Sequence, residues 1–226
     1  MFDIEKKPII IISTPRTGST ALCKIIYNKY KHLPNFKEYM EPLLPSESFE
    51  NFFTDVITNK NKNFVLKVQA GEIKNLPDEL DEILCYNHCT TIFLRRKDLI
   101  AQYTSNYIAK IRNYYIYKTK IVFPDKKLMR ELNSNIPANI NLMCEAIIDI
   151  DYHLNKMNNL IYKKNVEVYY EDLDLDQQDF YMKTIDCLNY DQLYNKIKDL
   201  NNKKNTPWFL NLTKSVTKNK FKNNSI

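Results

Sequence analysis

The fold of this 226-residue chain is indicated by one stretch, Ile9-Ile10-Ile11-Ile12-Ser13-Thr14-Pro15-Arg16-Thr17-Gly18-Ser19-Thr20. The isoleucine run is typical of a buried strand, and the helix-forming segment 21–26 follows the polar turn. A buried strand, a tight turn and a helix N-terminus make an anion-binding site, because the first helical N–H groups have no intrahelical partner. The stretch therefore predicts an α/β fold with a phosphate-binding loop.

Individual residues of this loop suit an anion. Gly18 is one of only two glycines in the chain, and it lets the backbone approach a phosphate closely. Arg16 adds a fixed positive charge, while Ser19 and Thr20 are expected to cap the helix and offer hydroxyls. The loop is not a Walker A motif, because Ser13 holds the place of its first glycine and no lysine separates Gly18 from Ser19.

Composition limits the classes of partner. The formal net charge is +6, and much of the excess lies in the tail at Lys214, Lys218, Lys220 and Lys222. Such a spread of lysines favours anionic ligands, but no nucleic-acid-binding signature accompanies it. The isoleucine run is too short to span a membrane, and no signal peptide is expected. These features predict a cytoplasmic protein without a nucleic-acid partner and without a transmembrane segment.

The cysteines predict thiols rather than disulfides or a metal centre. Five cysteines stand at irregular spacing in a chain without a secretory pattern, which indicates reduced thiols. The cluster Cys85-Tyr86-Asn87-His88-Cys89 lacks a second ligand pair at zinc-finger spacing and precedes an apolar strand. We therefore expect no metal site.

Strand and helix patterns alternate along the chain, which predicts a P-loop-like three-layer fold with a central parallel sheet flanked by helices. We expect one domain over 1–213 and a basic polar tail over 214–226. The segment 33–45 reads as irregular, and 123–135 as a flap. Strands are expected at 9–12, 63–68, 90–94 and 165–170, and helices at 47–60, 78–84, 98–118 and, as the longest, 136–164, with two short helices after the last strand.

A second basic segment lies at the end of another strand. Arg95 and Arg96 follow the apolar residues 90–94, and Ser105 stands about two turns into the next helix. Because ligands of parallel sheets bind beyond the carboxyl ends of the strands, this segment and the first loop are expected to converge. Two anion sites at neighbouring strand ends suggest one ligand with two separated phosphate groups.

These residues resemble sulfotransferases that use 3′-phosphoadenosine 5′-phosphosulfate (PAPS), and look most like the bacterial trehalose-type enzymes. The stretch 13–20 resembles their 5′-phosphosulfate loop, and the segment 96–105 resembles their 3′-phosphate segment. The stretch 34–42 is similar to their Pro-x-Glu-Tyr-Phe element, and Tyr170-Glu171-Asp172-Leu173 matches a late Tyr-Glu-Asp-Leu element. Lys97 replaces the second arginine of the family segment, which leaves open whether Arg95 or Arg96 holds the 3′-phosphate.

The resemblance implies transfer of a sulfuryl group from PAPS, as donor substrate, to a hydroxyl or amine of a small acceptor such as a sugar or lipid. Arg16 and the N–H groups of Thr17, Gly18, Ser19 and Thr20 then hold the 5′-phosphosulfate and stabilise the leaving phosphate, without a metal. The 3′-phosphate is assigned to Arg96 and Ser105.

A base must remove the acceptor's proton. The Pro-x-Glu-Tyr resemblance assigns this role to Glu38, and Glu41, His32 and His88 are its rivals.

Four further residues carry open alternatives. Lys67 either reaches the sulfuryl oxygens or extends to solvent. Glu171 and Asp172 cap a turn or pair with an arginine, and Trp208 stacks on adenine or only packs.

Two other functions remain open at this stage. A P-loop kinase for a small molecule needs a lysine before Ser19 and a magnesium-binding aspartate at a strand end, and neither is clear. A nucleotide-binding module without activity would keep the fold and bind the desulfated nucleotide without turnover. Neither the acceptor nor the oligomeric state is indicated by the sequence.

Overall fold

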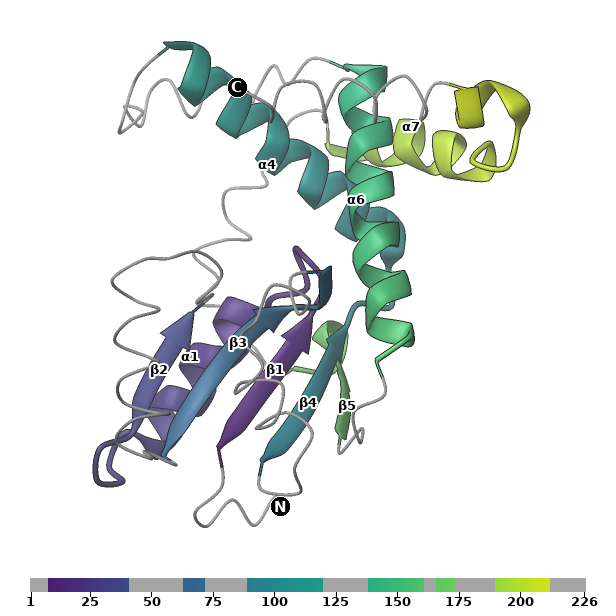
Figure 1. Ribbon diagram of the computed structural model, residues 1–226. Helices are drawn as coiled ribbons and strands as arrows, with labels where there is room; N and C mark the ends of the chain where they lie inside the picture. The colour runs from purple at the N-terminus through teal and green to yellow at the C-terminus, as the bar shows by residue number, and fades with distance from the viewer. Residues whose placement is uncertain are drawn as a thin grey trace, which may run out of the picture. The chain divides into compact units, whose positions relative to one another are not determined.

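The structure of the protein, a computed structural model, contains a five-stranded sheet in which every strand pairing is parallel (Figure 1). The strand order is β2-β3-β1-β4-β5, so the isoleucine strand lies in the middle. The strands are β1 (Ile9–Ser13), β2 (Lys37–Met40), β3 (Phe64–Gln69), β4 (Thr90–Arg95) and β5 (Val166–Tyr169). The described residues are 8–40, 63–71, 89–119, 138–160, 166–173 and 190–211.

The predicted α/β fold with a central parallel sheet is confirmed, and the four predicted strands correspond to β1, β3, β4 and β5. All five residues of β1 are buried, as expected for a strand with a neighbour on each side and a helical layer on each face.

The expectation of an irregular segment over 33–45 was wrong for Lys37–Met40, which forms β2 and pairs with β3, and residues 41–45 lie outside the described residues. Two of its four residues, Lys37 and Glu38, are charged, so it lacks the apolar pattern that marks the other strands.

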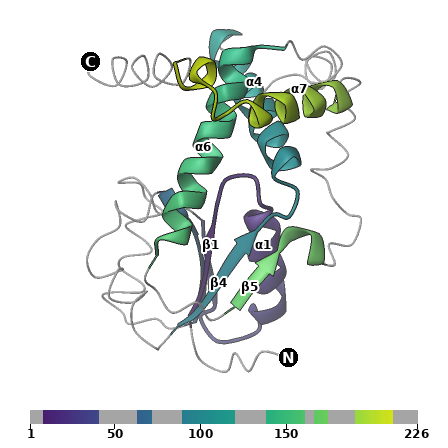
Figure 2. The same cartoon turned by 90° about the vertical axis from the view of Figure 1, so that its right-hand side faces the viewer.

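Each face of the sheet has its own apolar core. One face packs on the helix α1 (Ser19–Tyr30), and its strand residues include Ile9, Ile11 and Val65. The opposite face includes Ile10, Ile12 and Leu66, which pack in a cluster with Met157 of α6 (Ile140–Asn158). Figures 1 and 2 show α1 running along the sheet. Helices thus cover both faces, which gives the three layers that the sequence predicts.

The described chain forms two compact units. The first contains residues 1–97 and 152–174, and therefore the whole sheet, α1 and the last turns of α6. The second contains 98–151 and 175–226, with α4 (Leu99–Thr119), the first part of α6 and α7 (Tyr190–Asn202). In this unit α7 packs against α4 (Figure 2). The single domain expected over 1–213 stays a prediction.

The helix predictions differ in accuracy. The helix expected at 98–118 is confirmed as α4. The helix expected at 136–164 is described only over Ile140–Asn158, and with 19 residues it is shorter than α4 with 21, so it is not the longest. One of the helices expected after the last strand is α7, which has 13 residues and is not short. The helices expected at 47–60 and 78–84, the flap at 123–135 and the tail at 214–226 lie outside the described residues.

Candidate functional site

The ends of four strands define the candidate site. The end of β1 at Ser13 is level with the ends of β3 and β4, and the end of β4 is level with that of β5. The loop 14–18 after β1, Arg96 after β4 and Tyr170 after β5 therefore lie at the same edge of the sheet. Ligands of open α/β sheets bind at this edge.

The backbone of the loop after β1 has the geometry of an anion cradle. Arg16 and Gly18 both adopt left-handed conformations, with φ of 63° and 78°. Backbone N–H groups in turns that contain such residues form concave sites for anions. The Thr17 hydroxyl donates a hydrogen bond of 2.8 Å to the carbonyl of Thr14, which fixes the turn from inside. Arg16 is exposed, so its side chain is available to a ligand from solvent.

The helix α1 begins without a side-chain cap. Its N-cap residue is Gly18, and no side chain makes a capping hydrogen bond there. The expectation that Ser19 and Thr20 cap the helix was wrong, because both already belong to its first turn. The partial positive charge of the helix N-terminus is therefore left for another anion. Beneath the loop, the hydroxyl oxygen of the fully buried Ser13 has no hydrogen-bond partner within the described residues.

The side chain of Lys67 in β3 reaches the first turn of α1, next to this loop. Its side chain is only 6 % exposed, and its ammonium donates to the Thr20 hydroxyl at 3.3 Å. The alternative that Lys67 extends to solvent was wrong. A lysine buried to this extent needs a polar partner, and it brings a positive charge to the first turn of α1.

Glu38 lies in β2 on the α1 face of the sheet. It pairs with Val65 of β3, which belongs to the core on the α1 face, so the side chains of Glu38 and Lys67 are diagonal neighbours there. Burial, the Glu38 charge and a hydrogen bond to its carboxylate raise the pKa of Cys23 to about 12, against the effect of Lys67. The Oε1 atom of Glu38 is buried and has no hydrogen-bond partner in the described part of the chain.

The two adjacent arginines have different surroundings. Arg95 pairs with Glu167 of β5 at 2.5 Å and donates to the side chain of Asn158 at 2.9 Å. Arg96 instead donates to the backbone carbonyl of Arg16 in the loop, at 3.4 Å. Of the two candidates, Arg96 is therefore the one beside the loop.

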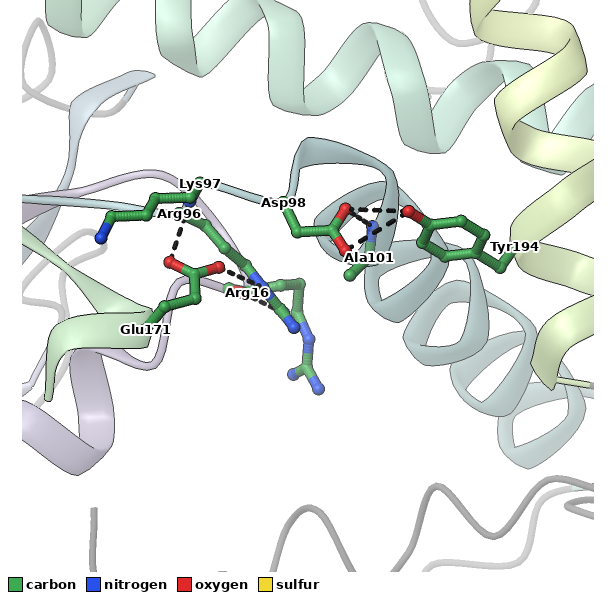
Figure 3. A network of polar contacts seen from close by, with 7 residues as sticks. All are labelled: Arg16, Arg96, Lys97, Asp98, Ala101, Glu171 and Tyr194. Atoms are coloured by element: carbon green, nitrogen blue, oxygen red, sulfur yellow. Dashed lines mark hydrogen bonds and ion pairs between the residues drawn. The ribbon is translucent and has the colours of Figure 1, made fainter. Parts of the chain in front are cut away.

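The turn after β5 contacts the segment that contains Arg96 through Glu171 (Figure 3). This turn is the 3-10 helix η3 (Tyr170–Asp172). Glu171 accepts a hydrogen bond of 2.9 Å from the N–H of Lys97 and lies 3.7 Å from Nε of Arg96. Asp172 pairs with the ammonium of Lys97 and raises the pKa of that lysine. Pairing of Glu171 with an arginine, one of the two predicted roles, is confirmed.

Tyr170 packs on the loop. A Cβ atom added to Gly18 would lie 2.5 Å from the Tyr170 ring, so the glycine is needed both for its φ and for this contact. The guanidinium of Arg96 stands over the same ring, 4.9 Å from its centroid.

Sequence reasoning missed His153, which fixes the end of β3. The N–H of Gly71 donates to Nδ1 of His153 at 2.8 Å, and the histidine is only 6 % exposed. Its ring would clash with any Cβ at Gly71. The chain has only two glycines, Gly18 and Gly71, and a Cβ at either position would clash with an aromatic ring. The scarcity of glycine could therefore have indicated that Gly71 lies against another side chain.

Other predicted site residues are not at the loop or are not described. His32 is exposed beyond the C-terminal end of α1, a 12-residue helix that starts at the loop, and so lies about 18 Å away. Glu41, Cys85 and His88 lie outside the described residues.

Ser105 belongs to the second unit, where it is 8 % exposed. Its assignment to a 3′-phosphate stays a prediction. Trp208 is half exposed and makes an edge contact with Phe209.

The second unit has a polar network among its own helices. The Tyr103 hydroxyl donates to Asp151 at 2.5 Å, and Lys204 approaches the same carboxylate at 3.4 Å. Burial and the bond to Asp151 raise the pKa of Tyr103. Asp149 likewise forms an ion pair with Lys110, at 3.2 Å, so each of the two carboxylates has a lysine partner within the unit.

No family model, no curated protein and no solved structure matches this chain. Among the described helices, none has the length and apolarity required to cross a membrane. Within the same residues, no group of three or more His, Cys, Asp or Glu side chains is arranged to hold a metal ion.

Proposed function

We propose that the chain is a PAPS-dependent sulfotransferase that moves a sulfuryl group to a hydroxyl or amine of a small acceptor, such as a sugar or lipid. The observation that carries the proposal is the loop 14–18. It has two left-handed residues, a hydrogen bond from Arg96, and after it an uncapped helix whose first turn accepts a hydrogen bond from Lys67. The resemblance of this loop to the 5′-phosphosulfate loop supplies the chemical class.

The loop residues supply the electrostatic part of catalysis. Arg16 and the N–H groups of residues 17–20 bind the 5′-phosphosulfate end of the donor. Lys67, which bonds to Thr20, adds positive charge at the same turn. Charge develops on the phosphate oxygen as its bond to sulfur breaks, and fixed donors stabilise such charge without reorganising. PAPS is an activated donor, so these residues need to position and stabilise rather than to activate.

Glu38 is the proposed base. An acceptor hydroxyl loses its proton to the Glu38 carboxylate while its oxygen forms the new bond to sulfur. The buried, unbonded Oε1 atom of Glu38 supports this role, because an unsatisfied buried acceptor is unusual unless it has a function. Glu38 and Lys67 lie on the same face of the sheet, and Lys67 bonds to the first turn of α1, so the Glu38 carboxylate is on the face that α1 covers.

A cytoplasmic location belongs to the same proposal. The cysteines among the described residues, Cys23, Cys89 and Cys144, are buried and form no disulfide, which is the state expected in a reducing compartment.

The proposal is tested with PAPS that carries a labelled sulfuryl group and a panel of sugars, lipids, phenols and amines. We expect label on at least one acceptor, equimolar release of 3′-phosphoadenosine 5′-phosphate, and loss of both in Arg16→Ala. Transfer from γ-labelled ATP with magnesium, and none from PAPS, would support the kinase alternative instead. Nucleotide binding without any transfer would support a non-catalytic module.

A further inference from the structure

The contacts around Arg96 do not resemble those of a side chain held ready only for a ligand. Three neighbours engage it: the carboxylate of Glu171, the ring of Tyr170 and the backbone carbonyl of Arg16. Its side chain is 14 % exposed, which is low for an arginine outside the core. The guanidinium is thus committed to the protein on several sides.

The carbonyl that Arg96 contacts belongs to the most strained part of the loop. Arg16 has a φ of 63°, and a left-handed conformation at a residue other than glycine costs free energy that surrounding contacts must offset. A hydrogen bond from a charged donor to the Arg16 carbonyl is such a contact. Tyr170 adds a second one, since its ring packs against Gly18.

Glu171 fixes the direction from which Arg96 acts. One of its oxygens accepts the N–H of Lys97, and the other lies beside Nε of Arg96 (Figure 3). The carboxylate therefore accepts a hydrogen bond from the backbone after Arg96 and at the same time forms an ion pair of 3.7 Å with the guanidinium of Arg96. Asp172, one residue further, pairs instead with the exposed ammonium of Lys97.

We propose that Glu171 is a positioning residue that holds Arg96 against the Arg16 carbonyl, so that the turn after β5 maintains the anion-binding conformation of the loop 14–18. The inference rests on the proposed function only for the identity of the ligand. It assigns Arg96 a role at the 5′ end of the nucleotide, whereas the resemblance assigns it to the 3′-phosphate.

The first test needs no ligand. Amide hydrogen exchange of the loop 14–18 is compared in the wild type, Glu171→Gln and the matched control Asp172→Asn. Loss of one charge-assisted contact should speed exchange of the loop about 3- to 10-fold in Glu171→Gln, and leave it unchanged in Asp172→Asn. Unchanged loop exchange in Glu171→Gln would overturn the proposal. Equal acceleration across all strands of the sheet would also overturn it, because that indicates a general loss of stability.

The second test separates the two roles of Arg96. Calorimetry measures the affinity of Arg96→Gln for 3′-phosphoadenosine 5′-phosphate and for AMP, with Lys97→Gln, whose exposed ammonium pairs with Asp172, as the control. If Arg96 acts through the loop, both affinities fall by the same factor, about 3- to 10-fold. A loss confined to the 3′-phosphorylated nucleotide would contradict the inference and leave the proposed function standing. If the wild type binds neither nucleotide, the proposed function fails, and the exchange experiment still decides the inference.

Discussion

The two compact units use their polar side chains in different ways. In the helical unit, Asp149 and Asp151 each meet a lysine, and Asp151 also accepts the Tyr103 hydroxyl. In the sheet unit, Arg96 donates to the loop 14–18, and Lys67 donates to Thr20 in the first turn of α1. The two carboxylates of the helical network are neutralised by lysines beside them, whereas Arg96 and Lys67 direct their charges to the loop and to the first turn of α1. We therefore expect the loop of the sheet unit to contribute most of the ligand binding and the Tyr103–Asp151–Lys204 network to contribute stability, with Ser105 a residue of the helical unit that has a predicted ligand role.

The largest effect is expected from Glu38→Gln. This change keeps the shape of the side chain and removes its basicity, so kcat should fall about 10²- to 10⁴-fold while nucleotide affinity hardly changes. The measurement is steady-state kinetics with an acceptor that the wild type sulfates.

His32→Asn and Glu41→Gln are the comparison variants for Glu38. Near-full kcat in Glu38→Gln with a loss in either of the others would place the base elsewhere. Activity in all three would mean that the acceptor supplies an already ionised nucleophile.

Arg16→Ala should give the next effect. We expect nucleotide affinity and kcat/KM to fall about 10- to 100-fold, because a charge-assisted contact to the phosphosulfate is lost. The exposed loop position means that the free energy of unfolding should change little. Calorimetry and urea denaturation measure the two quantities; an unfolded variant, or one with wild-type kinetics, would contradict the assignment.

Tyr103→Phe tests whether the polar network of the helical unit contributes stability rather than nucleotide binding. It removes the bond to Asp151, and hydrogen bonds to charged groups contribute about 1.5–3 kcal/mol, so the free energy of unfolding should fall by about that amount. Nucleotide affinity should stay at the wild-type value. Tyr194→Phe is the control, because its hydroxyl lies 3.4 Å from Asp98 on the surface and its loss should cost little. A loss of nucleotide affinity in Tyr103→Phe would break the proposed division between the units.

The smallest effect concerns pH and Cys23. Its pKa is raised from 9.0 to about 12, so the folded state keeps the thiol proton more tightly than the unfolded state does. The resulting stability is complete below about pH 9 and is lost as pH rises toward 12. Between pH 8 and 10.5, wild type should therefore lose about 1–2 kcal/mol more than Cys23→Ala. Urea denaturation with reductant measures this difference, which would be absent if the Cys23 proton were not held by burial and Glu38.

The predictable parts of the fold were those with strong local signals. A run of β-branched isoleucines favours a buried strand, and the turn after it contains a glycine at a position that needs a left-handed φ. β2 was not predictable in the same way, because Lys37 and Glu38 are charged and the segment forms a strand through its pairing with β3. Pairing partners are a property of the tertiary structure.

Within the site, the sequence indicated which residues carry the charge but not which of them meet. Arg95 and Arg96 are equivalent in sequence, and only the structure directs one to Glu167 and the other to the loop. The burial of Lys67 depends on the helix that covers its face of the sheet. Contacts between groups far apart in the chain, such as Gly71 with His153, leave no periodic trace in the sequence.

The central claim is that the loop 14–18 and the first turn of α1 form the phosphate site for a 3′-phosphoadenosine nucleotide. Calorimetry of the wild type with 3′-phosphoadenosine 5′-phosphate, AMP and ATP, each with and without magnesium, tests it most directly. The account predicts clearly tighter binding of the 3′-phosphorylated nucleotide, no requirement for magnesium, and loss of that binding in Arg16→Ala. Equal affinity for AMP, or binding of ATP that depends on magnesium and exceeds the others, would contradict it.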